Sequence, residues 1–201
     1  MIKAILFDAD GMTITPKNIF SVQFGLDFKI PQEKILPFFQ KEFQDCLTGK
    51  ADLKKAIVPY LKQWHWYKST DELLEYWFKS EHIINHRLIN LVKKLRHKKG
   101  IKCYLAMNQE KYRDKYIRKK MDLEKAFDGI FSSVLIGFQK PAKEFFNYIM
   151  RYLKNIKKNE ILSWDDKKEY VVAARKFGFK AEQYINYQQF IKSMKKYKFF
   201  V

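Results

Sequence analysis

A short apolar run at the start of the chain is the strongest constraint on its fold. Residues 2–7 read IKAILF and lead directly into Asp8-Ala9-Asp10-Gly11. A continuous apolar run closed by a turn sequence is typical of a strand buried on both faces of a parallel sheet. Sites in open parallel sheets form beyond the carboxyl ends of the strands. We therefore expect Asp8 and Asp10 to lie at such a site.

The rest of the chain divides into two patterns. Residues 31–43, 51–61 and 70–78 carry apolar residues at helical spacing, with no convincing strand between them. From about residue 86 we predict strands at 101–107, 129–135, 160–164 and 180–185, alternating with helices at 88–98, 111–121, 143–153, 169–177 and 188–196. This alternation predicts an α/β fold, a Rossmann-like doubly wound parallel sheet with an inserted small helical cap domain. The core domain would comprise residues 1–15 and 82–201, and the cap residues 16–81.

Composition limits the location and partners of the chain. No apolar run approaches the ~20 residues that span a bilayer, so no membrane association is expected. Two cysteines, Cys46 and Cys103, make no disulfide framework, which favours a reducing, cytoplasmic setting. The net charge is +18, but 34 of the 40 cationic residues are lysines scattered over nearly every segment. Base readout favours arginine, so compositional bias explains this charge better than nucleic-acid binding.

Polar side chains follow three of the predicted strands. Asp8 and Asp10 follow the first, Asn108 the second, and Asp165 and Asp166 the fourth. Four carboxylates at one sheet edge would repel one another strongly without a cation. Hard oxygen ligands of this kind suit Mg²⁺, which binds through one or two carboxylates, waters and a substrate phosphate. A lysine at a predicted helix start, Lys140, is the candidate counter-charge.

Four segments in this order resemble the motifs of the haloacid dehalogenase-like hydrolases. They are Asp8-Ala9-Asp10-Gly11 after a strand, Ala106-Met107-Asn108-Gln109, Gly137-Phe138-Gln139-Lys140-Pro141, and Leu162-Ser163-Trp164-Asp165-Asp166. One Asp-x-Asp-Gly alone is weak evidence, whereas four motifs in order at predicted strand or helix edges are strong. The resemblance runs from residue 2 to about residue 185, and the cap matches only in location and helical character.

The resemblance implies a role for each matching residue. Asp8 would be the nucleophile that forms an aspartyl-phosphate, and Asp10 the general acid and base. Asp8 and Asp166 would hold Mg²⁺, with Asp165 assisting and the backbone carbonyl of Asp10 as a further ligand. Lys140 would hold Asp8 and the phosphate oxygens. Gly11 would allow the tight turn behind the nucleophile, and Met107 and Asn108 would lie at the phosphate.

The function implied is a Mg²⁺-dependent phosphatase that hydrolyses a small phosphate monoester, such as a phosphosugar or a nucleotide-like metabolite. An aspartate at position 10 favours phosphoester hydrolysis over dehalogenation, where the family carries tyrosine. Met107 stands where the family has Thr or Ser, and a thioether donates no hydrogen bond. Lys167 follows the acidic pair and would compete with Mg²⁺ for it. These departures leave an alternative open: a catalytically impaired homologue that binds a phosphorylated ligand or a protein.

Overall fold

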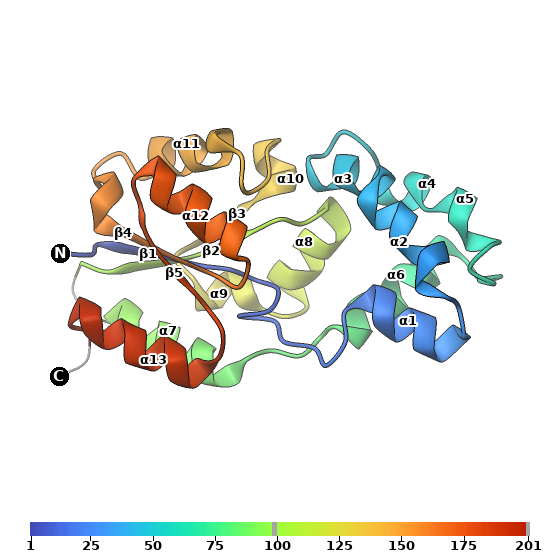
Figure 1. Cartoon of the computed structure of the whole chain (residues 1–201), viewed down its shortest axis with the longest axis horizontal. Helices are drawn as coiled ribbons and strands as arrows, with labels where there is room; N and C mark the ends of the chain where they lie inside the picture. Colours follow the sequence, from blue (N-terminus) through green and yellow to red (C-terminus); the bar gives the residue numbers. More distant parts are fainter. Residues whose placement is uncertain (98–99, 200–201) are drawn as a thin grey trace.

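The computed structural model describes residues 1–97 and 100–199, and its centre is a parallel sheet. The sheet has five strands in the order β3-β2-β1-β4-β5, and all four neighbouring pairs are parallel. The strands are β1 (Ala4–Phe7), β2 (Lys102–Met107), β3 (Gly129–Ser132), β4 (Ile161–Asp165) and β5 (Lys180–Gln183). Because β1 lies in the middle and is buried throughout, its carboxyl end lies at the centre of the sheet edge (Figure 1).

Helices cover both faces of the sheet. The face of Ala4 and Leu6 packs against α11 (Lys143–Tyr152) and α12 (Lys168–Phe177). The face of Ile5 and Phe7 packs against α7 (His86–His97), α9 (Leu123–Ala126) and α13 (Tyr187–Met194). Alternate residues of β1 thus enter separate cores, as strand geometry requires. Two short 3₁₀ helices, η1 (Lys158–Glu160) and η2 (Lys195–Tyr197), precede β4 and follow α13.

Six helices between β1 and β2 form a helical region with an aromatic core of its own. They are α1 (Phe20–Phe28), α2 (Gln32–Gln40), α3 (Glu42–Leu47), α4 (Leu53–Ala56), α5 (Val58–Leu61) and α6 (Thr70–Ser80). The core of this region includes Phe20, Phe24, Phe38, Trp64 and Trp77. The region lies beyond α8 (Lys111–Lys119), to the right of the sheet in Figure 1. That residues 16–81 act as a separate cap domain stays a prediction.

The chain crosses between the sheet and the helical region twice, and the two crossings run side by side. The N–H of Thr15 donates to the carbonyl of Ile83 at 2.8 Å, and the N–H of Asn85 donates to the carbonyl of Thr13 at 2.9 Å. Ile14 and Ile84 form an antiparallel bridge between these bonds. The first crossing starts only a few residues after Asp8 and Asp10.

The predicted α/β fold is confirmed, and several local predictions need correction. The helical pattern at 31–43 is interrupted at Lys41, where α2 ends and α3 begins. The strand predicted at 129–135 ends at Ser132, where its partner β2 also ends at Met107, and the chain continues as α10 (Ser133–Ile136). The helix predicted at 51–61 is two short helices that meet at Ile57. The first helix of the helical region, α1, was not predicted. Lys98, the predicted last residue of the helix at 88–98, lies outside the described residues.

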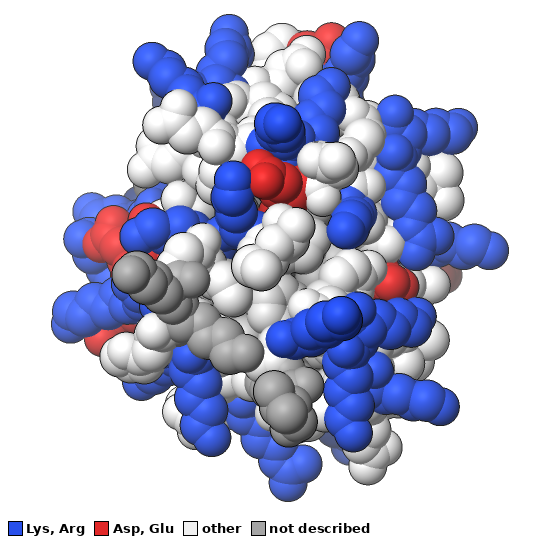
Figure 2. All heavy atoms as spheres, turned by 90° about the vertical axis from the view of Figure 1, so that its left-hand side faces the viewer, with Lys and Arg blue, Asp and Glu red and all other residues white. Residues whose placement is uncertain are grey.

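The described residues include no helix long and apolar enough to cross a membrane. Figure 2 shows the end of the molecule farthest from the helical region, where lysine and arginine side chains are spread over the face with uncharged residues between them. The charge on this face is therefore distributed rather than gathered into one stripe, as the scattered lysines of the sequence predict.

Candidate active site

Asp8 lies one residue beyond the end of β1, and its backbone is fixed on two sides. Its N–H donates to the carbonyl of Trp164 at 3.0 Å, which extends the pairing of β1 with β4. Its own carbonyl accepts a hydrogen bond of 2.6 Å from the hydroxyl of Thr13, which is fully buried. The carboxylate is consequently held in a defined position at the centre of the sheet edge.

Lys140 binds two of the predicted carboxylates at once. Its Nζ lies 2.6 Å from Asp8 Oδ1 and 2.6 Å from Asp165 Oδ2, and also donates to the carbonyl of Ala106 at 2.9 Å. The side chain is buried. Burial opposes the charged form of the lysine, but the pKa of Lys140 lies above its ordinary value because Asp8 and Asp165 stabilise the ammonium. It is therefore a charged counter-ion inside the site and not a surface lysine.

Asn108, after β2, contacts Lys140 through both ends of its amide. Asn108 Nδ2 donates to the carbonyl of Lys140 at 2.9 Å, and its Oδ1 accepts from the N–H of Lys140 at 2.8 Å. Nδ2 also lies 3.4 Å from the hydroxyl of Tyr170. In this arrangement Asn108 fixes the backbone of the residue whose ammonium holds Asp8.

Asp8, Asp165 and Asp166 form a compact acidic cluster. One oxygen from each lies within 4.8 Å of the others. Burial raises the pKa of Asp8 well above its ordinary value, and Asp165 adds to this effect while Lys140 opposes it. Burial and the charge of Asp165 likewise raise the pKa of Asp166. Three carboxylate oxygens this close together are a donor set suited to a hard divalent cation, so these residues fit Mg²⁺.

Gly11 turns the chain beside this cluster. Its φ is +79°, and a Cβ at this position would lie 2.8 Å from Cγ of Asp166. The left-handed backbone favours glycine, and a Cβ here would force the Asp166 carboxylate to move. The turn predicted behind Asp8 therefore also makes room for the second carboxylate of the fourth motif.

Asp10 is the exposed carboxylate of the site. Its side chain is 52% exposed, and its two oxygens contact different partners. Oδ2 accepts a hydrogen bond from Gln109 Nε2, and Oδ1 lies 3.3 Å from Nη2 of Arg113. Asp10 can thus be reached from solvent while its carboxylate is held from the protein side.

Met107 and Lys167 are two of the departures from the family motifs. Met107 is fully buried and packs in the core cluster that contains Phe7, where its thioether offers no donor. The N–H of Lys167 donates to Asp165 Oδ1 at 3.0 Å, and its ammonium lies 5.1 Å from the centre of the Tyr170 ring. The backbone of Lys167 therefore supports the acidic pair, while its ammonium has the Tyr170 ring as a neighbour.

Sequence reasoning missed three residues around Asp10: Gln109, Arg113 and Glu81. Arg113 is 2% exposed in its side chain and binds both Asp10 and Glu81. The signal available was an arginine one helical turn after the second motif, in a chain with only six arginines. Its partners are 103 and 32 residues away in sequence, so their identity depends on the folded structure.

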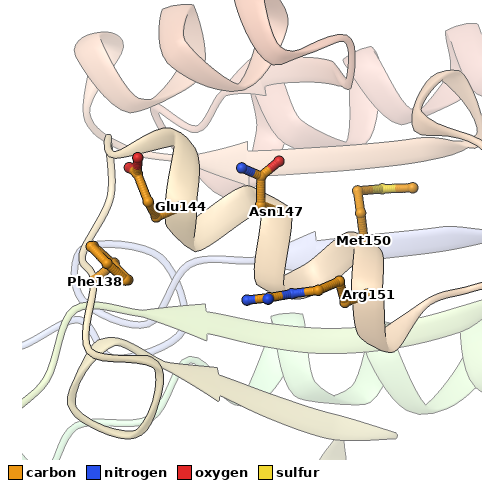
Figure 3. A pocket seen from close by; sticks show the side chains of 5 residues that line it. All are labelled: Phe138, Glu144, Asn147, Met150 and Arg151. Carbon is orange, nitrogen blue, oxygen red and sulfur yellow. The ribbon is translucent and has the colours of Figure 1, made fainter.

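A separate surface hollow lies along α11, away from these carboxylates. It has a volume of about 650 Å³ and is lined by Phe138, Glu144, Asn147, Met150 and Arg151. Figure 3 shows four of these side chains projecting from α11 and Phe138 from the loop before it. None of the predicted catalytic or metal-binding residues lines this hollow.

Comparison with known proteins identifies the class. The model of the haloacid dehalogenase-like hydrolases matches residues 2–183, and the chain belongs to this family. It is therefore a hydrolase by family. No curated protein matches it significantly.

Solved structures share the fold over almost the whole chain. A predicted HAD-like hydrolase from Porphyromonas gingivalis has a TM-score of 0.80 and 17% identity, with 100% of both chains covered. The HAD family enzyme BT-2542 from Bacteroides thetaiotaomicron, solved with magnesium and inorganic phosphate, has a TM-score of 0.75 and 20% identity over 91% of this chain and 94% of that one. L-2-haloacid dehalogenase from Xanthobacter autotrophicus has a TM-score of 0.66 and 17% identity, covering 96% and 82%.

Proposed function

We propose that the protein is a Mg²⁺-dependent phosphatase that hydrolyses a small phosphate monoester through an aspartyl-phosphate on Asp8. The observation that carries this proposal is the position of Lys140, whose Nζ lies 2.6 Å from both Asp8 and Asp165. A buried lysine between two carboxylates at the end of the central strand is suited to hold a nucleophile and an incoming phosphate together.

The reaction has two steps at phosphorus. An oxygen of Asp8 attacks the phosphorus, the bond to the ester oxygen breaks, and Asp10 gives its proton to the departing alcohol. Asp10 then takes a proton from a water molecule that attacks the aspartyl-phosphate, which releases inorganic phosphate and restores Asp8. The exposure of the Asp10 carboxylate supports this role, because it leaves the group open to both the alcohol and water.

Asp8, Asp165, Asp166 and the backbone carbonyl of Asp10 would hold Mg²⁺. When bound, the ion offsets the negative charge of the carboxylates and of the phosphate, which otherwise repel each other. BT-2542, the neighbour solved with magnesium and inorganic phosphate, supports this choice of metal and ligand. Gly11 keeps the turn open for Asp166. Asn108 would orient Lys140 at the phosphate, and Met107 would lie beside the phosphate without a donor.

We further propose that residues 16–81 form a cap over a core of residues 1–15 and 82–201. The aromatic core of the helical region and its two paired crossings support this division. A cap at this place would exclude water and select the substrate, a phosphosugar or nucleotide-like metabolite in a cytoplasmic setting. On the face shown in Figure 2 the charge is distributed, so this face gives no support for a nucleic-acid partner.

Hydrolysis of 4-nitrophenyl phosphate tests the proposal. We expect turnover by the wild type with Mg²⁺, and losses of at least ~10³-fold in the Asp8→Asn variant and with chelator. Asp122→Asn is the matched control, since Asp122 is exposed, far from the site in sequence, and at a φ of +55° that asparagine adopts readily. Turnover that survives Asp8→Asn would contradict the proposed nucleophile.

Complete burial of Met107 favours a second candidate, a catalytically impaired homologue that binds a phosphorylated ligand or a protein. The second motif then lacks its hydroxyl donor at the phosphate. Under this alternative, the folded wild type would bind inorganic phosphate in the presence of Mg²⁺ without hydrolysing any of a panel of phosphate monoesters. Titration calorimetry with inorganic phosphate, beside the turnover assay, distinguishes the two functions.

A further inference from the structure

Arg113 is a buried cation that the proposed reaction does not yet use. It lies in the first turn of α8, and its side chain is 2% exposed. Its Nη2 lies 3.0 Å from Oε2 of Glu81 and 3.3 Å from Oδ1 of Asp10. One guanidinium nitrogen therefore connects Asp10, the proposed general acid and base, to Glu81 at the end of the helical region.

The choice of arginine at this position has a physical reason. A buried cation is strongly unfavourable unless carboxylates compensate it with good geometry. The planar guanidinium offers several donors in a fixed arrangement, whereas a lysine ammonium is a compact point charge. Nη2 of Arg113 contacts both Asp10 and Glu81, and the guanidinium Cζ also lies 5.8 Å from the centre of the Phe78 ring, an aromatic contact that suits a planar guanidinium.

Glu81 anchors Arg113 to both crossings of the chain. Its Oε1 accepts the backbone N–H of Phe20, the first residue of α1, at 2.6 Å. Its Oε2 accepts Nε1 of Trp77, in α6, at 3.0 Å. Glu81 itself lies at the second crossing, directly after α6. The position of Arg113 consequently depends on how the helical region is seated on the core.

Asp10 is held at both oxygens by this arrangement. Arg113 binds Oδ1 and Gln109 Nε2 binds Oδ2, so rotation of the carboxylate is restricted from two directions. A carboxylate has about four acceptor sites, so two donors leave lone pairs available to a substrate or water. The half of Asp10 that remains exposed is then presented in one orientation.

We propose that Arg113 is a positioning residue that orients the Asp10 carboxylate for proton transfer and links this orientation to the seating of the helical region through Glu81. The inference rests on the proposed phosphatase function. Arg113 itself exchanges no proton and acts only through the Asp10 carboxylate. Its effect should therefore depend on how much the leaving group needs a proton.

Two aryl phosphates of similar size test this dependence. 4-Nitrophenolate leaves readily without a proton, whereas phenolate is a stronger base and gains more from a general acid. We expect Arg113→Met to lower kcat/KM for phenyl phosphate by about 10²-fold, within the range for loss of general acid catalysis, and for 4-nitrophenyl phosphate by less than about 10-fold. Asp10→Asn should show the same larger loss of kcat/KM for phenyl phosphate than for 4-nitrophenyl phosphate, and Glu81→Gln a smaller difference between the two.

Arg118→Met is the matched control, because Arg118 lies on the same helix and binds Asp114 at 2.8 Å without contacting Asp10. It should lower kcat/KM for both substrates equally or not at all. Arg113→Lys is the second variant, for use if Arg113→Met does not fold. It keeps the charge but not the geometry toward both carboxylates, and should show an intermediate difference between the kcat/KM losses for the two substrates. Equal losses for both substrates in folded Arg113 variants would overturn the positioning role alone. An inactive wild type would overturn the proposed function and this inference together.

Discussion

The amide of Asn108 and the backbone of Lys140 exchange two hydrogen bonds, 2.9 and 2.8 Å long. The two residues come from different motifs, 32 positions apart in sequence, and the pairing resembles the reciprocal bonds of two backbone segments. It fixes the loop from which the Lys140 ammonium reaches Asp8. The position of Asp8, the proposed nucleophile, thus depends on a residue that does not contact it.

Asn108→Ala removes both bonds of this pairing. We expect kcat for 4-nitrophenyl phosphate to fall by about 10–100-fold, the usual cost of losing a supporting partner of a site residue. Asn147→Ala, on the exposed face of α11, is the control and should leave kcat unchanged. Unchanged kcat in Asn108→Ala would show that Lys140 keeps its position without the amide.

Met107→Thr tests whether a missing hydroxyl limits turnover. A threonine would restore a donor beside the phosphate, and we expect kcat to rise by about 10²-fold. The smaller side chain leaves a cavity where Met107 is now fully buried, so the free energy of unfolding should fall by about 2 kcal/mol. Met107→Val has the shape of threonine without the hydroxyl and separates the two effects. Equal kcat in the Thr and Val variants would argue against a limiting donor.

Gly11→Ala should disturb both backbone and site. The residue has a φ of +79°, and the new Cβ would lie 2.8 Å from Cγ of Asp166. We expect the free energy of unfolding to fall by about 1–3 kcal/mol and Mg²⁺-dependent turnover to be lost. Gly100→Ala has a similar φ of +87° with no described atom within 4 Å of its Cβ, and therefore reports the backbone cost alone. If both variants keep full activity, the close approach of Asp166 is not required.

Stability should depend on pH through Glu110, the N-cap of α8. Burial raises its pKa from 4.5 to about 7, although backbone N–H groups of Tyr112 and Arg113 oppose this. The folded state therefore prefers the protonated form. Its contribution to stability is complete below pH 4.5 and is lost as pH rises through 7, a change on the order of 3 kcal/mol.

Glu110→Gln removes this titration and retains an acceptor for the backbone. Urea unfolding at pH 5 and pH 8 should show a smaller loss of stability in the variant than in the wild type. Glu124→Gln is the control, because Lys119 lowers the pKa of Glu124 and places its titration below this range. Equal pH dependence in wild type and Glu110→Gln would contradict the assignment.

Local sequence patterns were sufficient to predict the sheet and the principal carboxylates. The apolar run of β1 and the turn after it define the position of Asp8, and strand ends place Asn108 and Asp165 at the same edge. The extent of β3 was wrong because a strand ends where its neighbour ends, and Met107 closes β2 opposite Ser132. Pairing of this kind is a tertiary property that no local pattern contains.

The side chains that contact Asp10 could not be predicted from the sequence for the same reason. Gln109 and Arg113 reach Asp10 across 99 and 103 residues, and Glu81 directly follows α6 at the second crossing. Gln109 ends the second motif without a role assigned to it, and Arg113 and Glu81 lie outside all four motifs. Only the packing of α8 between the sheet and the helical region brings them to one carboxylate.

The paired crossings have a consequence for how chains of this kind diversify. Because Phe20 and Glu81 are hydrogen-bonded, the inserted segment leaves the sheet and returns to it at nearly the same point. A segment whose ends meet can be lengthened, shortened or exchanged as a block without altering the register of β1 or β2. We therefore expect that the segment between the crossings can be replaced as a block, provided that the new block brings an acidic residue to the position of Glu81.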